Sequence, residues 1–233
     1  MDRPLLIVDD RRVLFIGPVD HVPPHAPMVP VFGGGVEHPY GLRIDGETRS
    51  VRAAVVGAQV SREVFAHGEL LAVMPFDPGL LRRGETLDED GAVAALQALT
   101  RGHDPRAWRA LATAVGLSER QDDLPAPIER ALEVLRERSD ENAPVERIAE
   151  IVGLSVSRLQ HAFKEHVGTT MRTYRLWKRF VAVAAVMRGG GSLTEAAHHV
   201  GFFDSAHLSR AFRRCFGVTP SFVFAPEVAI HVV

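Results

Sequence analysis

Hydrophobic residues follow two different periods along the chain, and the period changes near residue 85. Before that point, short apolar runs are separated by turn residues, a pattern that predicts β-strands. The expected strands are Val13–Ile16, Val29–Phe32, Tyr40–Ile44, Val51–Val56 and Leu70–Val73. Turn signals are found at Gly33-Gly34-Gly35, Asp45-Gly46 and His67-Gly68. Residues 1–84 are therefore predicted to form an all-β domain, a small barrel or sandwich.

After residue 85 the apolar positions recur every three or four residues, which predicts helices. One is expected over Asp88–Thr100 and is ended by Gly102. A second begins at Asp104-Pro105, where aspartate can cap the helix and proline fits its first position. Residues 121–127 combine acidic residues with prolines and are predicted to be a linker. The helical pair and linker thus occupy residues 85–124.

Residues 125–226 are predicted to be entirely helical. Ser155 and Asp204 are expected to cap two matching helices, and Ser192–Glu195 has the pattern of a capping box. A last short helix opens at Pro220. The other expected helices are Ile128–Arg138, Pro144–Val152 and Thr170–Arg188.

Residues 152–174 are repeated in altered form over residues 200–223. From Ser155 and Asp204 onward the offset is 49 residues, with five identical pairs: Leu159/Leu208, Ala162/Ala211, Phe163/Phe212, Gly168/Gly217 and Thr170/Thr219. Each copy combines a helix, a glycine turn and a capped second helix. The repeat therefore predicts two helix-turn-helix units, over residues 144–167 and 192–216.

The second helix of each unit keeps a polar face once its buried stripe is removed. In the first copy that face consists of Val156, Ser157, Arg158, Gln160, His161, Lys164 and Glu165. In the second copy it consists of Ser205, Ala206, His207, Ser209, Arg210, Arg213 and Arg214. An α-helix fits the DNA major groove, where Gln, His and Arg can bind base edges and Ser, Lys and Arg can hold phosphates. A single such helix could equally be a solvated surface, but two copies with matching turns and caps favour DNA binding.

Charge is distributed unevenly between the two halves. The chain has a net charge of −2, yet residues 1–124 carry 13 Lys/Arg against 18 Asp/Glu, and residues 152–222 carry 10 against 3. A basic C-terminal part supplies the local attraction that DNA phosphates require. The single cysteine, Cys215, excludes an intrachain disulfide and fits a reducing cytoplasm. No stretch approaches the roughly 18 apolar residues of a membrane span. A cytoplasmic protein with no membrane partner is expected.

Residues 125–226 closely resemble the DNA-binding domain of the AraC/XylS transcription regulators. The resemblance rests on I-A-E-I-V-G-L-S-x-x-x-L at Ile148–Leu159 and F-K-E-x-x-G at Phe163–Gly168. Above all it rests on G-F-x-D-x-x-x-L-S-R-A-F-R-R-x-F-G-x-T-P at Gly201–Pro220. It implies seven helices, with the helix over Thr170–Arg188 joining the two units. It also implies that both reading helices enter successive major grooves on one face of the DNA.

Family contacts carried over position by position indicate which side chains read bases: Ser157, Gln160, His161, Ala206, His207 and Arg210. Position 157 is often larger in the family, and Ala206 has no polar group to read a base. The second helix is therefore expected to contribute more anchoring than reading. The side chains expected to hold phosphates are Ser155, Lys164, Arg175, Lys178, Ser205, Arg213 and Arg214.

The N-terminal half resembles the cupin-like β-barrel that this family commonly carries for effector binding or dimerisation. A cupin enzyme would hold a metal with a His-x-His pair, an acidic residue and a later histidine. Here His25-Ala26-Pro27 stands where the pair is expected, and Val60-Ser61-Arg62 stands in place of the later histidine. Pro23-Pro24 prevents a helix that would align His21 with His25, although Glu37-His38 could supplement them. No metal, cofactor or catalytic residue is predicted.

The predicted fold class is multi-domain α+β: a cupin-like β-barrel with two helices, followed by an all-α double helix-turn-helix domain. The predicted function is sequence-specific regulation of transcription, with activation implied by the resemblance. Double-stranded DNA is the expected partner. Further candidate partners are a small-molecule effector, RNA polymerase and a second copy of the chain. The alternatives are an architectural DNA binder without an effector and a cupin-type metalloenzyme with a DNA-binding tail.

Overall fold

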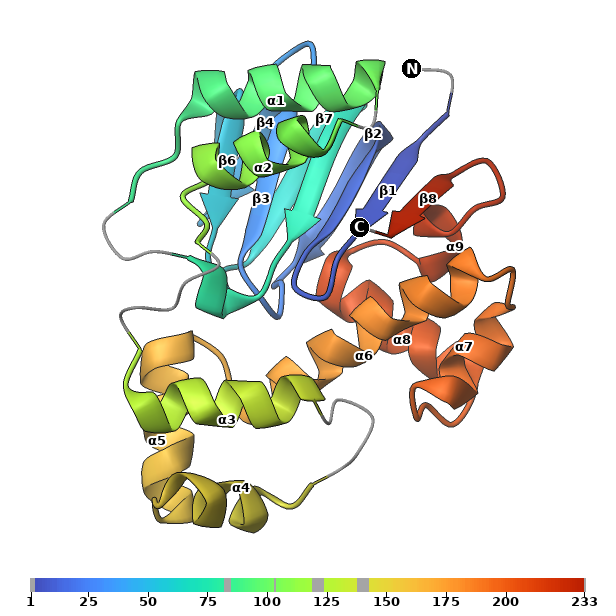
Figure 1. The fold of residues 1–233 in the computed structure, drawn as a ribbon. Coiled ribbons are helices and arrows are strands. Elements are labelled where there is room, and N and C mark those ends of the chain that lie inside the picture. The colour runs from blue at the N-terminus through green and yellow to red at the C-terminus, as the bar shows by residue number, and fades with distance from the viewer. Residues whose placement is uncertain (1–2, 82–84, 103, 119–123, 138–142, 233) are drawn as a thin grey trace.

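The N-terminal half is built on an eight-stranded mixed sheet, seen in a computed structural model that describes residues 3–81, 85–102, 104–118, 124–137 and 143–232 (Figure 1). Its long antiparallel strands, β2 and β7, pair at the centre. The order is β5-β4-β7-β2-β1-β8; off this path β3 pairs with β7, and β6 pairs with β3. The strands are β1 (Leu5–Val8), β2 (Val13–His25), β3 (Val31–Gly35), β4 (Tyr40–Ile44), β5 (Glu47–Val51), β6 (Ala53–Val56), β7 (Arg62–Pro75) and β8 (Ala229–Val232).

Two of the three predicted turns lie inside strands. Gly33–Gly35 belongs to β3. A Cβ at Gly33 would lie 2.5 Å from the Tyr40 hydroxyl, and one at Gly35 would lie 1.9 Å from the His38 carbonyl oxygen. Glycine is needed there for close approach rather than for turning. His67-Gly68 has positive φ angles and lies where the β2–β7 register shifts, so it is a bulge within β7. The third turn, Asp45-Gly46, joins β4 to β5 as predicted.

One face of the sheet is covered by the two helices that follow it. These are α1 (Glu89–Arg101), capped by Asp88, and α2 (Pro105–Ala114), capped by Asp104, as predicted. A short 3-10 helix, η1 (Pro78–Leu80), follows β7. In Figure 1, α1 and α2 cross in front of the strands. Side chains from both layers meet in one core, including Phe32, Phe76, Leu96 and Leu111.

The C-terminal half consists of seven helices in its described residues, as the family resemblance implies. They are α3 (Ala126–Glu137), α4 (Val145–Val152), α5 (Val156–Val167), α6 (Met171–Arg188), α7 (Leu193–His199), α8 (Ser205–Phe216) and α9 (Pro220–Val223). Most of these bounds agree with the prediction to within about two residues. Part of the predicted linker, residues 121–123, lies outside the described residues, as does Arg138. The predicted fold class, a β domain followed by a helical domain, is confirmed.

The opposite face of the sheet packs against the helical domain in a second core. Alternate residues of β1 show the division, because Leu5 and Ile7 belong to the first core, whereas Leu6 and Val8 join the second. After α9 the chain returns as β8 and pairs in parallel with β1 (Figure 1). The helical domain is thereby attached to the sheet by packing and by a strand. None of the described helices combines the length and the apolar character that crossing a membrane requires.

Candidate DNA-binding surface and interdomain cavity

The first helix-turn-helix unit is formed by α4 and α5. Gly153 makes the turn with φ of 70°, which glycine adopts readily. The Ser155 hydroxyl accepts a hydrogen bond from the Arg158 backbone N–H at 3.3 Å and so starts α5. Leu159 and Phe163 are fully buried. The three side chains predicted to read bases from this unit, Ser157, Gln160 and His161, are all exposed.

The second unit repeats this construction with α7 and α8. A capping box joins Ser192 and Glu195 at the start of α7, as predicted. The Asp204 carboxylate accepts a hydrogen bond from the His207 backbone N–H at 2.6 Å and starts α8. The predicted base-reading residues Ala206, His207 and Arg210 are exposed. Each unit thus presents a free polar face on its second helix.

The predicted phosphate contacts divide into three groups. Exposed side chains are found at Ser155, Lys164, Arg213 and Arg214. Two are half-buried: Ser205, the first residue of α8, and Arg175, which donates a hydrogen bond to the Ala143 carbonyl oxygen. Lys178 forms the third group because it is buried.

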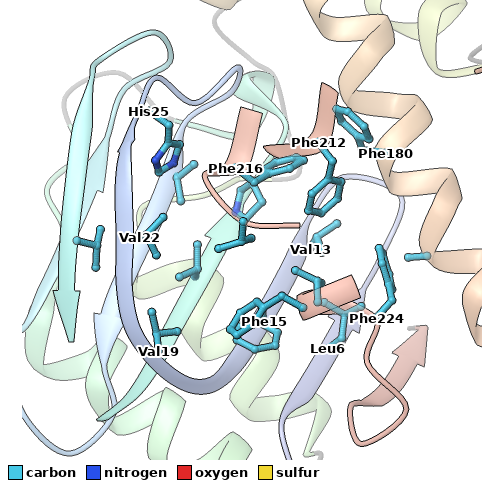
Figure 2. A pocket seen from close by; sticks show the side chains of 18 of the residues that line it. Leu6, Val13, Phe15, Val19, Val22, His25, Phe180, Phe212, Phe216 and Phe224 are labelled. Carbon is cyan, nitrogen blue, oxygen red and sulfur yellow. The ribbon is translucent and has the colours of Figure 1, made fainter. Parts of the chain in front are cut away.

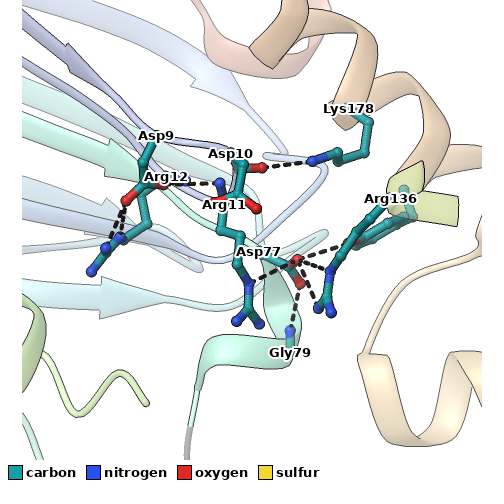
Figure 3. Close-up of polar contacts among 9 residues, drawn as sticks. Asp9, Asp10, Arg11, Arg12, Asp77, Gly79, Arg136 and Lys178 are labelled. Atoms are coloured by element: carbon teal, nitrogen blue, oxygen red, sulfur yellow. Dashed lines mark hydrogen bonds and ion pairs between the residues drawn. The ribbon is translucent and has the colours of Figure 1, made fainter. Parts of the chain in front are cut away.

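Lys178 is a correction to the sequence-based prediction. It lies on the side of α6 that faces the β domain, and its ammonium group donates a hydrogen bond to the Asp10 carbonyl oxygen at 2.6 Å (Figure 3). Burial lowers the pKa of this ammonium group. In this structure Lys178 fastens α6 to the loop between β1 and β2, and it is not available to DNA.

A buried carboxylate lies beside this contact and joins the two domains (Figure 3). Asp77, fully buried after β7, accepts hydrogen bonds from the Tyr174 hydroxyl at 2.7 Å and the Arg136 guanidinium at 3.1 Å. It also accepts one from the Gly79 N–H at 2.9 Å, and the Arg11 guanidinium lies 3.5 Å away. Burial raises the pKa of Tyr174, and the Asp77 carboxylate raises it further. Asp77 therefore connects the sheet to α3 and α6.

A groove of about 670 Å³ separates the two helix-turn-helix units. Gln160 from α5 and His207 from α8 both line it, so it opens next to both reading faces. Its lining also includes Arg172, Arg175, Arg179 and Arg214. Sequence reasoning did not single out Arg172 and Arg179. Their spacing could have identified them, because intervals of three and four residues along α6 place arginines 172, 175 and 179 on one side of the helix.

A mainly apolar cavity of about 80 Å³ lies between the sheet and the helical domain (Figure 2). Phe15 and Val22 approach it from the β2 strand, and Phe180, Phe212 and Phe216 approach it from α6 and α8. The Phe180 ring packs 5.3 Å from the rings of both Phe212 and Phe216. The cavity thus directly adjoins the second reading helix.

Two buried polar side chains, His25 and Arg62, line the same cavity. The Nδ1 atom of His25 lies 2.9 Å from the Pro23 carbonyl oxygen, while Nε2 is buried and has no hydrogen-bond partner within the part of the chain that the structure describes. Burial lowers the pKa of His25 to about 4, so the ring is neutral at pH 7. Arg62 is 7% exposed, and its Nε atom has no hydrogen-bond partner among the described residues. Burial lowers the pKa of Arg62 to about 10, which leaves it charged at pH 7.

The residues considered for a cupin-type metal do not gather around one point. His21 pairs with Glu63 at 2.9 Å, whereas His25 faces the cavity. Among the described residues, three possible ligand side chains do come within 4.8 Å of one another, Glu37, His38 and Glu69, but all three are exposed. Cys215 is buried, and burial raises the pKa of its thiol to about 11, as expected of a packing residue.

Comparison with known proteins agrees with this geometry. Residues 148–225 match the family model described as a helix-turn-helix domain. The chain is 36% identical over 100 residues to the transcriptional regulator RipA of Corynebacterium glutamicum, covering 42% of this chain and 30% of RipA. It is 30% identical over 84 residues to the arabinose operon regulatory protein of Escherichia coli, covering 36% of this chain and 29% of that protein. The chain therefore spans less than a third of the length of these two relatives.

The overall arrangement is similar to a solved structure of ToxT from Vibrio cholerae. The TM-score is 0.61 at 11% identity, over 92% of this chain and 98% of ToxT. Another ToxT structure, with a TM-score of 0.55, 10% identity and coverage of 92% and 95%, contains a bound unsaturated fatty acid. The fold and the two exposed reading faces define a two-domain helix-turn-helix protein. The helix-turn-helix match over residues 148–225, and the transcription regulators that share this region, agree with the resemblance of the C-terminal domain to the AraC/XylS regulators.

Proposed function

We propose that this protein regulates transcription by binding a specific DNA sequence with both helix-turn-helix units at once. The observation that carries the proposal is the pair of capped helices, α5 and α8, whose polar faces are both exposed. The two helices lie in successive segments of the major groove, about one helical turn apart. The protein works in the cytoplasm at the nucleoid, and activation through contact with RNA polymerase is the regulatory outcome.

Each class of side chain has its own task on the DNA. Gln160, His161 and Arg210 bind base edges and select the sequence. Ser157 and His207 assist them, and Ala206 offers its methyl group to a thymine. Lys164, Arg213 and Arg214 hold phosphates and supply affinity without sequence information, with help from Ser155, Ser205 and Arg175.

The effector is a small amphipathic carboxylate held in the interdomain cavity. A buried arginine without an acidic partner is costly, and a carboxylate is the anion whose geometry suits a guanidinium group. Arg62 would bind the carboxylate, and the phenylalanines would enclose the apolar chain. The fatty acid bound in ToxT supports this choice. Because the cavity holds only a short chain, a longer ligand would move α8 away from the sheet.

The two rival functions predict different behaviour. An architectural DNA binder would show DNA affinity that no small molecule changes. A cupin-type metalloenzyme would need the exposed Glu37, His38 and Glu69 cluster as its metal site, and nothing there excludes water. A second copy of the chain is a further candidate partner, because many regulators bind paired sites as dimers.

Selection from a random duplex library tests the DNA-binding proposal. With the full chain at near-physiological salt, we expect an enriched motif with two blocks about one helical turn apart. Affinity for that motif should fall steeply as salt rises, because phosphate contacts release counterions. Binding without any enriched motif, with or without added carboxylates, would contradict sequence-specific regulation and favour an architectural role.

Tryptophan fluorescence tests the effector. Trp177 lines the cavity, whereas Trp108 lies in the other core, so a Trp108→Phe variant makes Trp177 the only reporter. We expect saturable changes with straight-chain carboxylates from hexanoate to palmitoleate and much weaker binding of their methyl esters. Arg62→Met should weaken carboxylate binding by about 2–5 kcal/mol, since it removes one member of a buried charge pair. The exposed Arg49→Met is the matched control. Equal binding of acids and esters would contradict the role of Arg62.

A further inference from the structure

The floor of the groove between the two units is a stripe of arginines on α6. Arg172, Arg175 and Arg179 are spaced by three and four residues, so they project from one side of the helix. Arg172 is exposed, and the other two are half-buried. Arg214 of α8, also exposed, lines the groove from the opposite wall. Four guanidinium groups therefore share one surface depression.

The groove is built for an anion. Its lining within the described chain contains no carboxylate side chain, although glutamine, histidine and threonine contribute to it. The arginines are close enough to affect one another, because burial and the positive charge of Arg179 lower the pKa of Arg175. A negatively charged occupant would relieve this repulsion and form charge-assisted hydrogen bonds.

The position of the groove indicates which anion that is. Gln160 and His207, on its two walls, belong to the two reading faces. A Cβ added at Gly201, in the turn of the second unit, would lie 3.7 Å from the guanidinium carbon of Arg179, so the stripe extends to that turn. When two reading helices occupy neighbouring major-groove segments on one face of B-DNA, the minor groove between them faces the protein. The groove would then lie over that minor groove and its two backbones.

Arginine side chains prefer a narrow DNA minor groove. A/T-rich DNA has a narrow minor groove with an enhanced negative potential, which attracts arginine side chains. G·C pairs place an amino group in the minor groove and lack this feature. Selection of the spacer then depends on DNA shape and requires no hydrogen bond to a base edge in the major groove.

We propose that Arg172 and Arg179, supported by Arg175 and Arg214, bind across the minor groove between the two half-sites, so that the protein selects an A/T-rich spacer. This rests on the proposed DNA-binding function and adds a third reading element to the two helices. The half-site sequence is chosen by α5 and α8. The spacer is chosen by α6.

Inosine substitution provides the test. An I·C pair shows the major-groove pattern of G·C but lacks its minor-groove amino group, so it behaves as A·T only when the minor groove is read. The selected site would be made with A·T, G·C and I·C spacers, and the affinity of the full chain measured on each. We expect the A·T and I·C spacers to bind about tenfold more tightly than G·C, which corresponds to about 1.4 kcal/mol.

Variants then assign the effect to the stripe. Arg172→Gln and Arg179→Gln should reduce the spacer preference to below about twofold while half-site selectivity is kept. Arg188→Gln, an exposed arginine on α6 outside the groove, is the matched control and should keep the full preference. Thermal unfolding of each variant verifies that it is folded.

Three results would overturn the proposal. Equal affinity for all three spacers would show that the minor groove is not read. An equal loss on every spacer in Arg172→Gln would make that residue a simple phosphate anchor. Unchanged DNA binding in both variants would indicate that the groove receives an acidic segment of a protein partner. Each of these is compatible with a selected half-site motif, so the proposed function would stand while the spacer proposal fails.

Discussion

Replacing Asp77 with alanine is expected to lower the free energy of unfolding by about 3–5 kcal/mol. Asp77 is fully buried and accepts hydrogen bonds from Tyr174 of α6 and Arg136 of α3. Removing the carboxylate takes a buried hydrogen-bond acceptor away from the Tyr174 hydroxyl and from the Arg136 guanidinium, which is only 19% exposed. Breaking a buried charge pair by removing one member costs more than the loss of the hydrogen bonds alone.

Urea denaturation followed by circular dichroism measures this effect. Glu47→Ala is the control, because Glu47 forms an ion pair with Arg49 at 2.8 Å in which both side chains are more than 70% exposed. That pair should contribute less than about 1 kcal/mol. A loss of less than about 1 kcal/mol in Asp77→Ala would mean that the domains are held together mainly by apolar packing, the β1–β8 pairing and polar contacts such as that of Lys178 with Asp10.

The double variant His161→Ala/Arg210→Ala is expected to lose about 2–6 kcal/mol of binding free energy on the selected site. Each side chain is exposed on a different reading helix, α5 or α8, and each should contribute about 1–3 kcal/mol if it binds a base edge. Because the two residues belong to separate units without shared partners, the single effects should add. Titration of the unaltered protein, the two single variants and the double variant against labelled duplex at fixed salt measures the four binding free energies.

A matched control is His199→Ala/Arg188→Ala, which removes the same two residue types from exposed positions on α7 and α6 outside the reading faces. It should leave specific binding within about 0.5 kcal/mol of the unaltered protein. Equal losses on random DNA would reassign His161 and Arg210 to phosphate binding. A loss confined to one single variant would show that only one unit reads the sequence.

Local sequence signals predicted the helical domain almost completely. Ser155, Asp204 and the Ser192–Glu195 capping box act on backbone groups within three residues, and all three start helices where expected. The sequence repeat further predicted that these helices form two helix-turn-helix units. The exposed positions of Gln160, His161 and Arg210 were predicted because these residues lie outside the buried apolar stripe of their helix. Each of these inferences depends on neighbours one or two helical turns away.

The β domain was predicted less well because its elements depend on distant partners. β1 was not predicted, since Leu5–Val8 is apolar at every position and shows no alternation. Its side chains enter two cores in turn, and both faces are covered. Gly33–Gly35 was assigned to a turn, whereas the structure uses it for close packing against Tyr40 and the 38–39 backbone. β8 likewise depends on a distant partner, because it pairs in parallel with β1.

By itself, then, the sequence determined the helices, their caps, the duplication and the family resemblance of the C-terminal part, because each is encoded in residues close together along the chain. Only the tertiary structure decided which charged side chains remain available. It buries Lys178 against Asp10, gathers Arg172, Arg179 and Arg214 around one groove, and brings His25 and Arg62 into one apolar cavity. The physical reason is that the burial and partners of a charged group depend on segments far away in sequence, which local patterns do not specify.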